Sequence, residues 1–235
     1  MSTPVYKDWY AALTHALKKE GENGGVLQLA TLEGSDTPRV RSVVHREFLT
    51  ANAFPNVPLI VSTTDIRTPK VFQMMNIGQR VEAVYWTAST QEQYRITGKA
   101  SVIPRPGCQS PCPSGSGLIF DELAKEGFDW ENKRVEVFDR MSGHLKASWC
   151  RPIPGTPLEG GYEEANKWPE KLPKLGGAES EEDKKNLEYA LENFALLLIE
   201  PFEVDFVELG TTPQKRTKFR RDSGAVEFKK TILVP

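Results

Sequence analysis

The chain has 235 residues, of which 39% are hydrophobic and 26% are charged, and its formal net charge is −2. This composition is ordinary for a globular protein with one sizeable core or two small ones. The charge argues against general nucleic-acid binding, which depends on neutralising phosphates, and no run approaches the roughly 18 apolar residues of a membrane span. We therefore expect no nucleic-acid partner and no membrane insertion.

The first residues carry no apolar signal core, so a cytoplasmic location is expected. Three cysteines in a cytoplasmic chain predict free thiols. Cys108 and Cys112 lack a second Cys or His pair at zinc spacing, so no metal site is predicted. The chain has no nucleophile elbow, glycine-rich phosphate loop or dinucleotide fingerprint, and only three histidines are present to act as bases. No catalytic residue is assigned.

Residues 6–19 place Trp9, Leu13 and Leu17 at helical spacing, and Gly21 and the Gly24–Gly25 pair end this first helix. A strand over 26–32 follows, then turn residues 33–38 and a second strand over 39–48, which predicts an antiparallel hairpin.

The strand predicted over 39–48 combines valines with four Arg or His residues. A strand of this kind suits a sheet edge or barrel wall that packs on one side and holds an anion on the other; an exposed strand with solvated arginines is the simpler alternative. Arg41 and Arg46 fall on opposite faces of a regular strand. Either a bulge separates them, or only Arg41 contacts a ligand of its own subunit.

Residues 59–62 read as a short buried strand. Thr68, as N-cap, and Pro69 then begin a helix through Met75. Strands over 80–87 and 92–103 follow, joined by a link of hairpin length. The short, even spacing predicts a mostly β protein built as a small antiparallel, Greek-key-like barrel with peripheral helices.

The second half of the chain adds a loop rich in Pro, Gly and Ser over 104–117 and helices over 118–125 and 135–149. A long surface excursion follows over 151–182, then a helix over 181–193 and strands over 194–200, 202–209, 216–221 and 226–234. Too little follows the excursion to form another domain, so one domain over 1–235 is expected, with surface insertions at 104–117 and 151–182.

One short segment has the chemistry of a phosphate site. Hydroxyls, free N–H groups at a helix start and two cations are what a phosphate dianion requires, and they occur within eight residues: Thr63, Thr64, Arg67, Thr68 and Lys70. A capped helix with solvated charges would give the same pattern. The Arg-rich strand beside it favours a phosphorylated cofactor.

The order of four motifs resembles the pyridoxamine 5′-phosphate oxidase-like FMN-binding split-barrel family. The motifs are Leu29-Ala-Thr-Leu32, Pro38-x-x-Arg41, Leu59-Ile-Val-Ser-Thr-Thr-Asp-x-Arg-Thr-Pro-Lys70 and Gln93-Tyr-Arg-Ile-Thr-Gly98. The third is similar to the branch with an Arg-Ser/Thr-Pro-Lys phosphate motif. That branch also carries a Trp-Pro-x-Pro-Gly-like segment, partly matched by Arg151-Pro-Ile-Pro-Gly155.

The resemblance implies FMN as the cofactor, at the interface of a homodimer. It places Arg41 and the backbone of Ser42, Val43 and Val44 beside the flavin ring and ribityl chain. It places Thr63 and Thr64 near the ring and phosphate arm, with Arg67, Thr68 and Lys70 around the phosphate. Gln93 and the late Arg216 would also reach the cofactor, and Arg46 would border the substrate opening.

The implied function is an FMN-dependent oxidoreductase that transfers a hydride to or from an unassigned small molecule. The substrate pocket would be covered by the two insertions. Three alternatives stay open: a non-catalytic flavin or small-ligand carrier, a true pyridoxamine 5′-phosphate oxidase, and a haem protein with His45 or His144 as axial ligand. The true oxidase is disfavoured because its late Arg-x-His pair has no histidine counterpart in residues 211–217.

Overall fold

The computed structural model describes residues 8–21, 25–75 and 79–235. Within these ranges, nine strands form one antiparallel sheet in the order β2-β1-β5-β6-β7-β4-β3, with β8 added to β7 and β9 to β8. The strands are β1 Val26–Glu33, β2 Thr37–Val44, β3 Glu47–Leu49, β4 Leu59–Asp65, β5 Arg80–Thr87, β6 Glu92–Ile103, β7 Phe194–Glu208, β8 Lys215–Arg220 and β9 Lys229–Leu233.

The sheet closes on itself because its two ends, β2 and β3, are consecutive in the chain. Only His45 and Arg46 separate them, and both bond across the gap: the His45 amide donates to the Gly25 carbonyl at 2.5 Å, and the Arg46 amide donates to the Val61 carbonyl at 2.8 Å. The Ser62 hydroxyl also donates to the Val44 carbonyl at 2.8 Å. The predicted antiparallel split barrel with peripheral helices is therefore confirmed.

The long strand β7 joins two hydrophobic cores. The first half of β7 pairs with β4, and its second half pairs with β8. The whole of β6 pairs with β7, over β7 residues 196–208. Alternate residues of β4 and β7 face opposite sides, so Ile60 and Leu197 enter the barrel core, and Val61 and Leu198 enter a second core under the helices. Burial on both faces explains the continuous apolar runs that predicted these strands.

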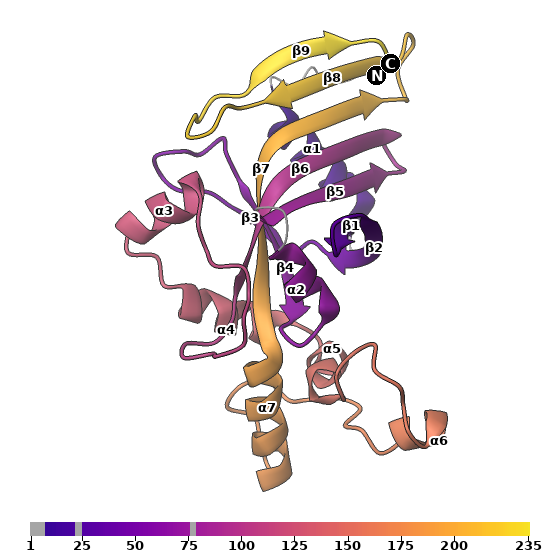
Figure 1. The fold of residues 1–235 in the computed structure, drawn as a ribbon, viewed down its shortest axis with the longest axis vertical. Helices are drawn as coiled ribbons and strands as arrows, with labels where there is room; N and C mark the ends of the chain where they lie inside the picture. The colour runs from indigo at the N-terminus through magenta and orange to yellow at the C-terminus, as the bar shows by residue number, and fades with distance from the viewer. Residues whose placement is uncertain (1–7, 22–24, 76–78) are drawn as a thin grey trace.

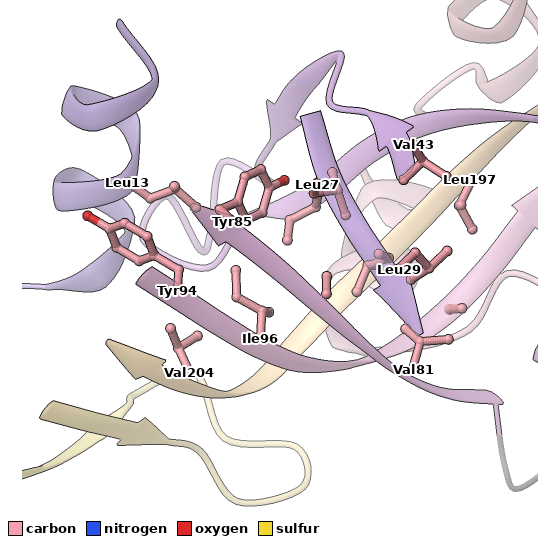
Figure 2. Packing of buried hydrophobic residues seen from close by; sticks show 14 of the residues in the cluster. Leu13, Leu27, Leu29, Val43, Val81, Tyr85, Tyr94, Ile96, Leu197 and Val204 are labelled. Atoms are coloured by element: carbon pink, nitrogen blue, oxygen red, sulfur yellow. The ribbon is translucent and has the colours of Figure 1, made fainter. Parts of the chain in front are cut away.

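The barrel core is covered by α1 Trp9–Glu20, which begins at the N-cap Asp8. Figure 2 shows Leu13 of this helix beside Tyr85 and Tyr94, which come from the strands. The predicted start of the helix at Tyr6, and Gly24 in its predicted stop, lie outside the described residues.

The other helices are α2 Pro69–Met74, α3 Leu118–Lys125, α4 Trp130–Arg140, α5 Gly143–Ala147, α6 Gly161–Ala165 and α7 Glu181–Asn193. In Figure 1, α7 leads straight into β7, with α3 and α4 on one side of this axis and α5 and α6 on the other. No helix in the described ranges is long and apolar enough to cross a membrane.

Two predicted elements are each divided in the structure. The strand predicted over 39–48 breaks into β2 and β3 at the corner that closes the barrel. The helix predicted over 135–149 starts earlier, at Trp130, and divides into α4, α5 and a 3-10 turn, because Ser142 begins a new helix as N-cap.

The strands predicted over 194–200 and 202–209 form the single strand β7, which contains Pro201. Thr97 pairs with Glu203 and Gly98 with Pro201, so Phe202 is an extra residue in a bulge. The two strands approach closely here: a Cβ at Gly98 would lie 2.6 Å from the Ile199 side chain and 2.8 Å from the Glu200 carbonyl oxygen. Gly98 allows this approach and thereby lets the strand continue past the proline.

Candidate functional site

A cleft of about 530 Å³ opens where β2 and β4 end and α2 begins. Its opposite wall consists of Leu145, Ser148, Trp149, residues 151–158 and Trp168. A volume of this size is typical of small-molecule and cofactor sites. The wall from the excursion is rich in proline and the barrel wall in hydroxyls and cations, so the cleft combines an apolar side with a polar one.

Most of the predicted site residues meet in this cleft. The lining includes Ser42, Val43, Val44, Arg46, Thr63, Thr64, Thr68 and Lys70. They converge because the strand ends of β2 and β4 lie side by side at the barrel closure, and α2 starts directly after β4.

Lys70 and Arg46 supply positive charge to the cleft. The Lys70 ammonium donates to the Thr68 hydroxyl at 3.0 Å. Burial lowers its pKa to about 8, an effect increased by Arg41 and opposed by Asp65. Arg46 Nη2 donates to the Thr63 hydroxyl at 3.4 Å, while its buried Nε has no hydrogen-bond partner. Burial, and to a smaller extent Arg140, lowers the pKa of Arg46.

This donor set fits an anion. In the described part of the chain, neither Lys70 nor Arg46 forms an ion pair with a carboxylate. A buried guanidinium nitrogen without a partner is costly and is normally satisfied by an acceptor. Two cations and two hydroxyls around one cleft match the requirements of a phosphate group.

Arg67 lies outside this cleft. Its Nη2 donates to Asp65 Oδ2 at 2.6 Å, its Nε donates to Asp65 Oδ1 at 3.0 Å, and its Nη1 donates to the Tyr189 hydroxyl at 3.1 Å. The side chain borders a second cavity formed with Phe72 and Met75. Asp65 lines the main cleft, but Arg67 neutralises it.

Three further predicted residues also lie away from the cleft. Arg41 points to the side of the hairpin, where its guanidinium donates to the Leu29 carbonyl, the Thr31 hydroxyl and the Gln73 side-chain oxygen. Gln93 is on β6. Arg216, on β8, forms an ion pair with Asp205.

Both candidate haem-ligating histidines lie outside the lining of the cleft. His45 packs between Phe48 and Tyr85, and its Nδ1 lies 3.0 Å from the Tyr85 hydroxyl. Burial lowers the pKa of His45 to about 4. Nδ1 of His144 lies 3.0 Å from the Glu170 carbonyl oxygen. These positions give both histidines structural contacts.

Sequence reasoning missed the wall opposite the barrel. Trp149, Arg151 and Trp168 line the cleft, yet none was assigned a role. The proline-rich match at 151–155 was the available signal. Of the two insertions expected to cover the pocket, 151–182 does so, but no residue of 104–117 lines the cleft. That loop packs Cys108 and Cys112 against the barrel core instead.

Residues 6–104 match the family model for the FMN-binding domain of pyridoxamine 5′-phosphate oxidase. A pyridoxamine 5′-phosphate oxidase-related, FMN-binding protein from Nostoc punctiforme superposes with a TM-score of 0.70 at 23% identity, covering 100% of both chains. PhzG from Burkholderia lata, solved with tetrahydrophenazine-1-carboxylic acid, superposes with a TM-score of 0.63 at 14% identity, covering 100% of this chain and 98% of its own.

No curated protein sequence matches this chain. The family model confirms the predicted resemblance and the predicted cofactor, FMN, over residues 6–104, and the two solved structures confirm the fold. The single domain over 1–235 remains a prediction. The branch with the Arg-Ser/Thr-Pro-Lys motif remains a prediction.

Proposed function

With an FMN-binding domain of the pyridoxamine 5′-phosphate oxidase family at residues 6–104 as the premise, we propose that this protein binds FMN in the cleft between β4 and the 151–158 segment. The observation that carries the proposal is the pair of cations Lys70 and Arg46, which reach the cleft without carboxylate partners in the described residues.

Each cation has a distinct role towards the phosphate. Lys70 acts as a point charge, fixed by the Thr68 hydroxyl, while Arg46 contributes its guanidinium from the barrel corner. The Thr63 hydroxyl lies beside Arg46 and can donate as well. Val43 and Val44 on one wall and Trp149 on the other give apolar surface suited to a flat ring.

The protein is proposed to be an oxidoreductase acting on a small molecule, since FMN when bound supplies hydride transfer. Residues of the chain bind and orient the cofactor and the substrate, and the 151–158 segment excludes water from the cleft. The structure places no histidine in the lining and only one side chain, Lys70, whose pKa is shifted close to neutrality. Because Lys70 is assigned to the phosphate, no side chain of the lining is assigned as a proton donor to the substrate.

The site is completed, we propose, by a second copy of the chain. Directly paired residues share a face of an antiparallel sheet, and the registers place one such row across six strands: Ser42, Gln28, Val84, Arg95, Asp205 and Lys218. Gln93 and Arg216 stand two residues from members of this row and share its face. The shorter route from Arg216 to the cleft follows β7, where Val207 pairs with Arg216 and Leu196 pairs with the cleft residue Thr63. At about 3.3 Å per residue, this separation of eleven residues spans roughly 36 Å.

That distance is too great for Arg216 to reach the cleft of its own chain. The same face is apolar near the cleft, where Val40 is 65% exposed and Trp86 is 49% exposed. A two-fold dimer through this face would cover the apolar surface and bring Gln93 and Arg216 towards the partner's cleft. This supports the homodimer with FMN at its interface that the resemblance implied.

The first test is whether the purified protein carries FMN. Purified protein should show flavin absorbance, and denaturation should release FMN in a ratio of about one per chain, identified by mass. A Lys70→Ala and Arg46→Ala double variant should release most of it. Protein that folds normally but neither carries nor binds added FMN would overturn the proposal.

A non-catalytic flavin carrier is the alternative, because no catalytic residue is assigned in the lining. Anaerobic reduction of the bound flavin by NADPH, followed by reoxidation with a substrate, separates an oxidoreductase from a carrier. Direct assay of pyridoxal 5′-phosphate formation tests the true oxidase, which the missing late histidine disfavours.

A further inference from the structure

Residues 151–168, here called the flap, form the wall of the cleft opposite the barrel. They contain α6, which projects away from the sheet beside α5 (Figure 1). The flap starts directly after the 3-10 turn that carries buried Trp149, and ends at Trp168.

The chain just beyond the flap is anchored firmly. The Leu172 amide donates to the Gly143 carbonyl at 3.0 Å, and the Leu175 amide donates to Asp139 Oδ1 at 2.8 Å. Asp139 is fixed in turn by Lys146, whose side chain is 1% exposed and whose ammonium lies 3.1 Å from Oδ1. The end of the flap is therefore held in a defined position, and Trp168 lies just before this anchor.

Arg151 and Trp168 close the neck of the flap. The Arg151 guanidinium carbon lies 5.8 Å from the centroid of the Trp168 ring, a cation–π arrangement that orients the guanidinium. Both side chains line the cleft, next to Pro152 and Pro154. The flap thus offers one positive charge beside flat, apolar surfaces.

Arg151 is exposed at the mouth of the cleft, and among the described residues it forms no ion pair with a carboxylate. The lining holds Arg46, Lys70 and Arg151, while Asp65 is neutralised by Arg67. A phosphate carries about −1.5 to −2 charges at pH 7. After FMN binds, about one positive charge remains, and Arg151 is the cation on the wall opposite the phosphate donors.

We propose that the flap forms a subsite for a planar aromatic carboxylate, in which Arg151 pairs with the carboxylate and Trp168 is a positioning residue that holds the guanidinium and contacts the ring. The inference rests on the proposed function, because the subsite shares the cleft with FMN. The fork of a guanidinium matches a carboxylate in two parallel hydrogen bonds, which gives a preference for a planar anion.

The test uses FMN-loaded full-length protein and 2-naphthoate as the probe, with 2-naphthamide as its neutral counterpart and cyclohexanecarboxylate as its non-planar one. FMN affinity is measured first, separately, for every variant. Probe binding is then followed by calorimetry and by perturbation of the flavin absorbance. Arg151→Ala and Trp168→Ala are compared with Trp168→Phe and with Lys167→Ala, an exposed neighbour.

The wild type should prefer 2-naphthoate to both counterparts. Arg151→Ala should weaken 2-naphthoate about tenfold and leave FMN affinity within about threefold. Trp168→Ala should weaken 2-naphthoate binding as well, while Trp168→Phe and Lys167→Ala should retain it.

Equal binding of 2-naphthoate and 2-naphthamide, or absence of probe binding, would overturn the subsite. Loss of FMN in Arg151→Ala would assign Arg151 to the cofactor and likewise overturn it. Failure of the wild type to bind FMN would instead refute the proposed function.

Discussion

Arg67 is bound to Asp65 by three side-chain hydrogen bonds: Nη2 donates to Oδ2 at 2.6 Å, and Nε donates to Oδ1 at 3.0 Å and to Oδ2 at 3.2 Å. The Arg67 amide also donates to Asp65 Oδ1, at 2.8 Å. Burial acts to lower the pKa of Arg67, but hydrogen bonding and attraction to Asp65 outweigh it, so the net shift is upward. This pairing ties the end of β4 to the start of α2 and removes the negative charge of Asp65 from the cleft.

The main effect of Arg67→Ala should therefore be a lower free energy of unfolding, rather than a loss of FMN contacts. Asp65 is 8% exposed, and removing the partner of a buried charge costs about 3–5 kcal/mol. The partial exposure of this pair places the expected loss at the lower end. Urea denaturation of the FMN-free protein measures it. Unchanged stability together with loss of FMN would show that Arg67 binds the phosphate directly.

Lys70→Ala should instead weaken FMN binding without destabilising the FMN-free protein. Its charge-assisted contact with a phosphate is worth about 1.5–3 kcal/mol, so the Kd for FMN should rise at least tenfold. The FMN-free protein should lose no stability at neutral pH, because burial disfavours the charge that the substitution removes. Lys18→Ala, an exposed lysine on α1, is the matched control and should change neither. Wild-type FMN affinity in Lys70→Ala would contradict the assignment.

The pKa of Lys70, lowered by burial to about 8, predicts a pH dependence. Because FMN binding favours protonated Lys70, affinity should fall as pH rises through about 8, and binding near pH 8 to 9 should take up a proton. In FMN-free protein the unfolded chain binds more protons between about pH 8 and the ordinary lysine pKa of 10.5. Stability should therefore rise with pH across that window.

Calorimetry in buffers of different ionisation enthalpy measures the proton uptake, and urea denaturation across pH measures the stability. Lys70→Met should abolish the uptake and flatten the stability profile between pH 8 and 10.5. A profile of the same slope in the variant would mean that another group titrates there.

Local chemistry made much of the fold predictable. The helix over 181–193 was predicted with both ends from the acidic residues of its first turn, and the structure adds a reciprocal capping box between Ser180 and Asp183. Thr68 occupies the N-cap position and Pro69 begins α2, as predicted, although the Thr68 hydroxyl donates back to the Asp65 carbonyl at 2.7 Å. These signals lie within a few residues of each other, so the sequence contains them.

The features that the sequence could not supply depend on distant partners. Pro201 normally ends a strand, but here Gly98, about a hundred residues earlier, allows a bulge that absorbs it. A charge pattern likewise could not tell whether Arg67 faces a bound phosphate or Asp65. Arg151 and Trp168 show no periodic relation, because their contact depends on anchors at α5.

The exposed sheet face gives a prediction about assembly. Val40 is 65% exposed on β2 and does not line the cleft. If a second copy covers this face, Val40→Glu should bury two charges per dimer and convert the protein to a monomer in sedimentation velocity runs, with loss of FMN affinity. Tyr162→Glu, at a side chain 92% exposed on the flap, should remain dimeric. A Val40→Glu dimer that keeps its FMN would place the interface elsewhere.

The anchor of the flap can be loosened at one position. A Cβ at Gly143 would lie 2.5 Å from the Leu172 carbonyl oxygen and 3.3 Å from the Lys171 side chain, so Gly143→Ala must displace this segment. Overpacking of this kind costs about 1–3 kcal/mol. Neither Gly143 nor Leu172 lines the cleft, so FMN affinity should change little. Limited proteolysis should cut the Gly143→Ala variant more readily within residues 151–168, and iodide should quench its bound flavin more strongly.

Lys171→Ala, at an exposed side chain, should match the wild type in both measurements. Increased quenching without increased cleavage would show that the cleft opens by a movement of the barrel wall rather than of the flap.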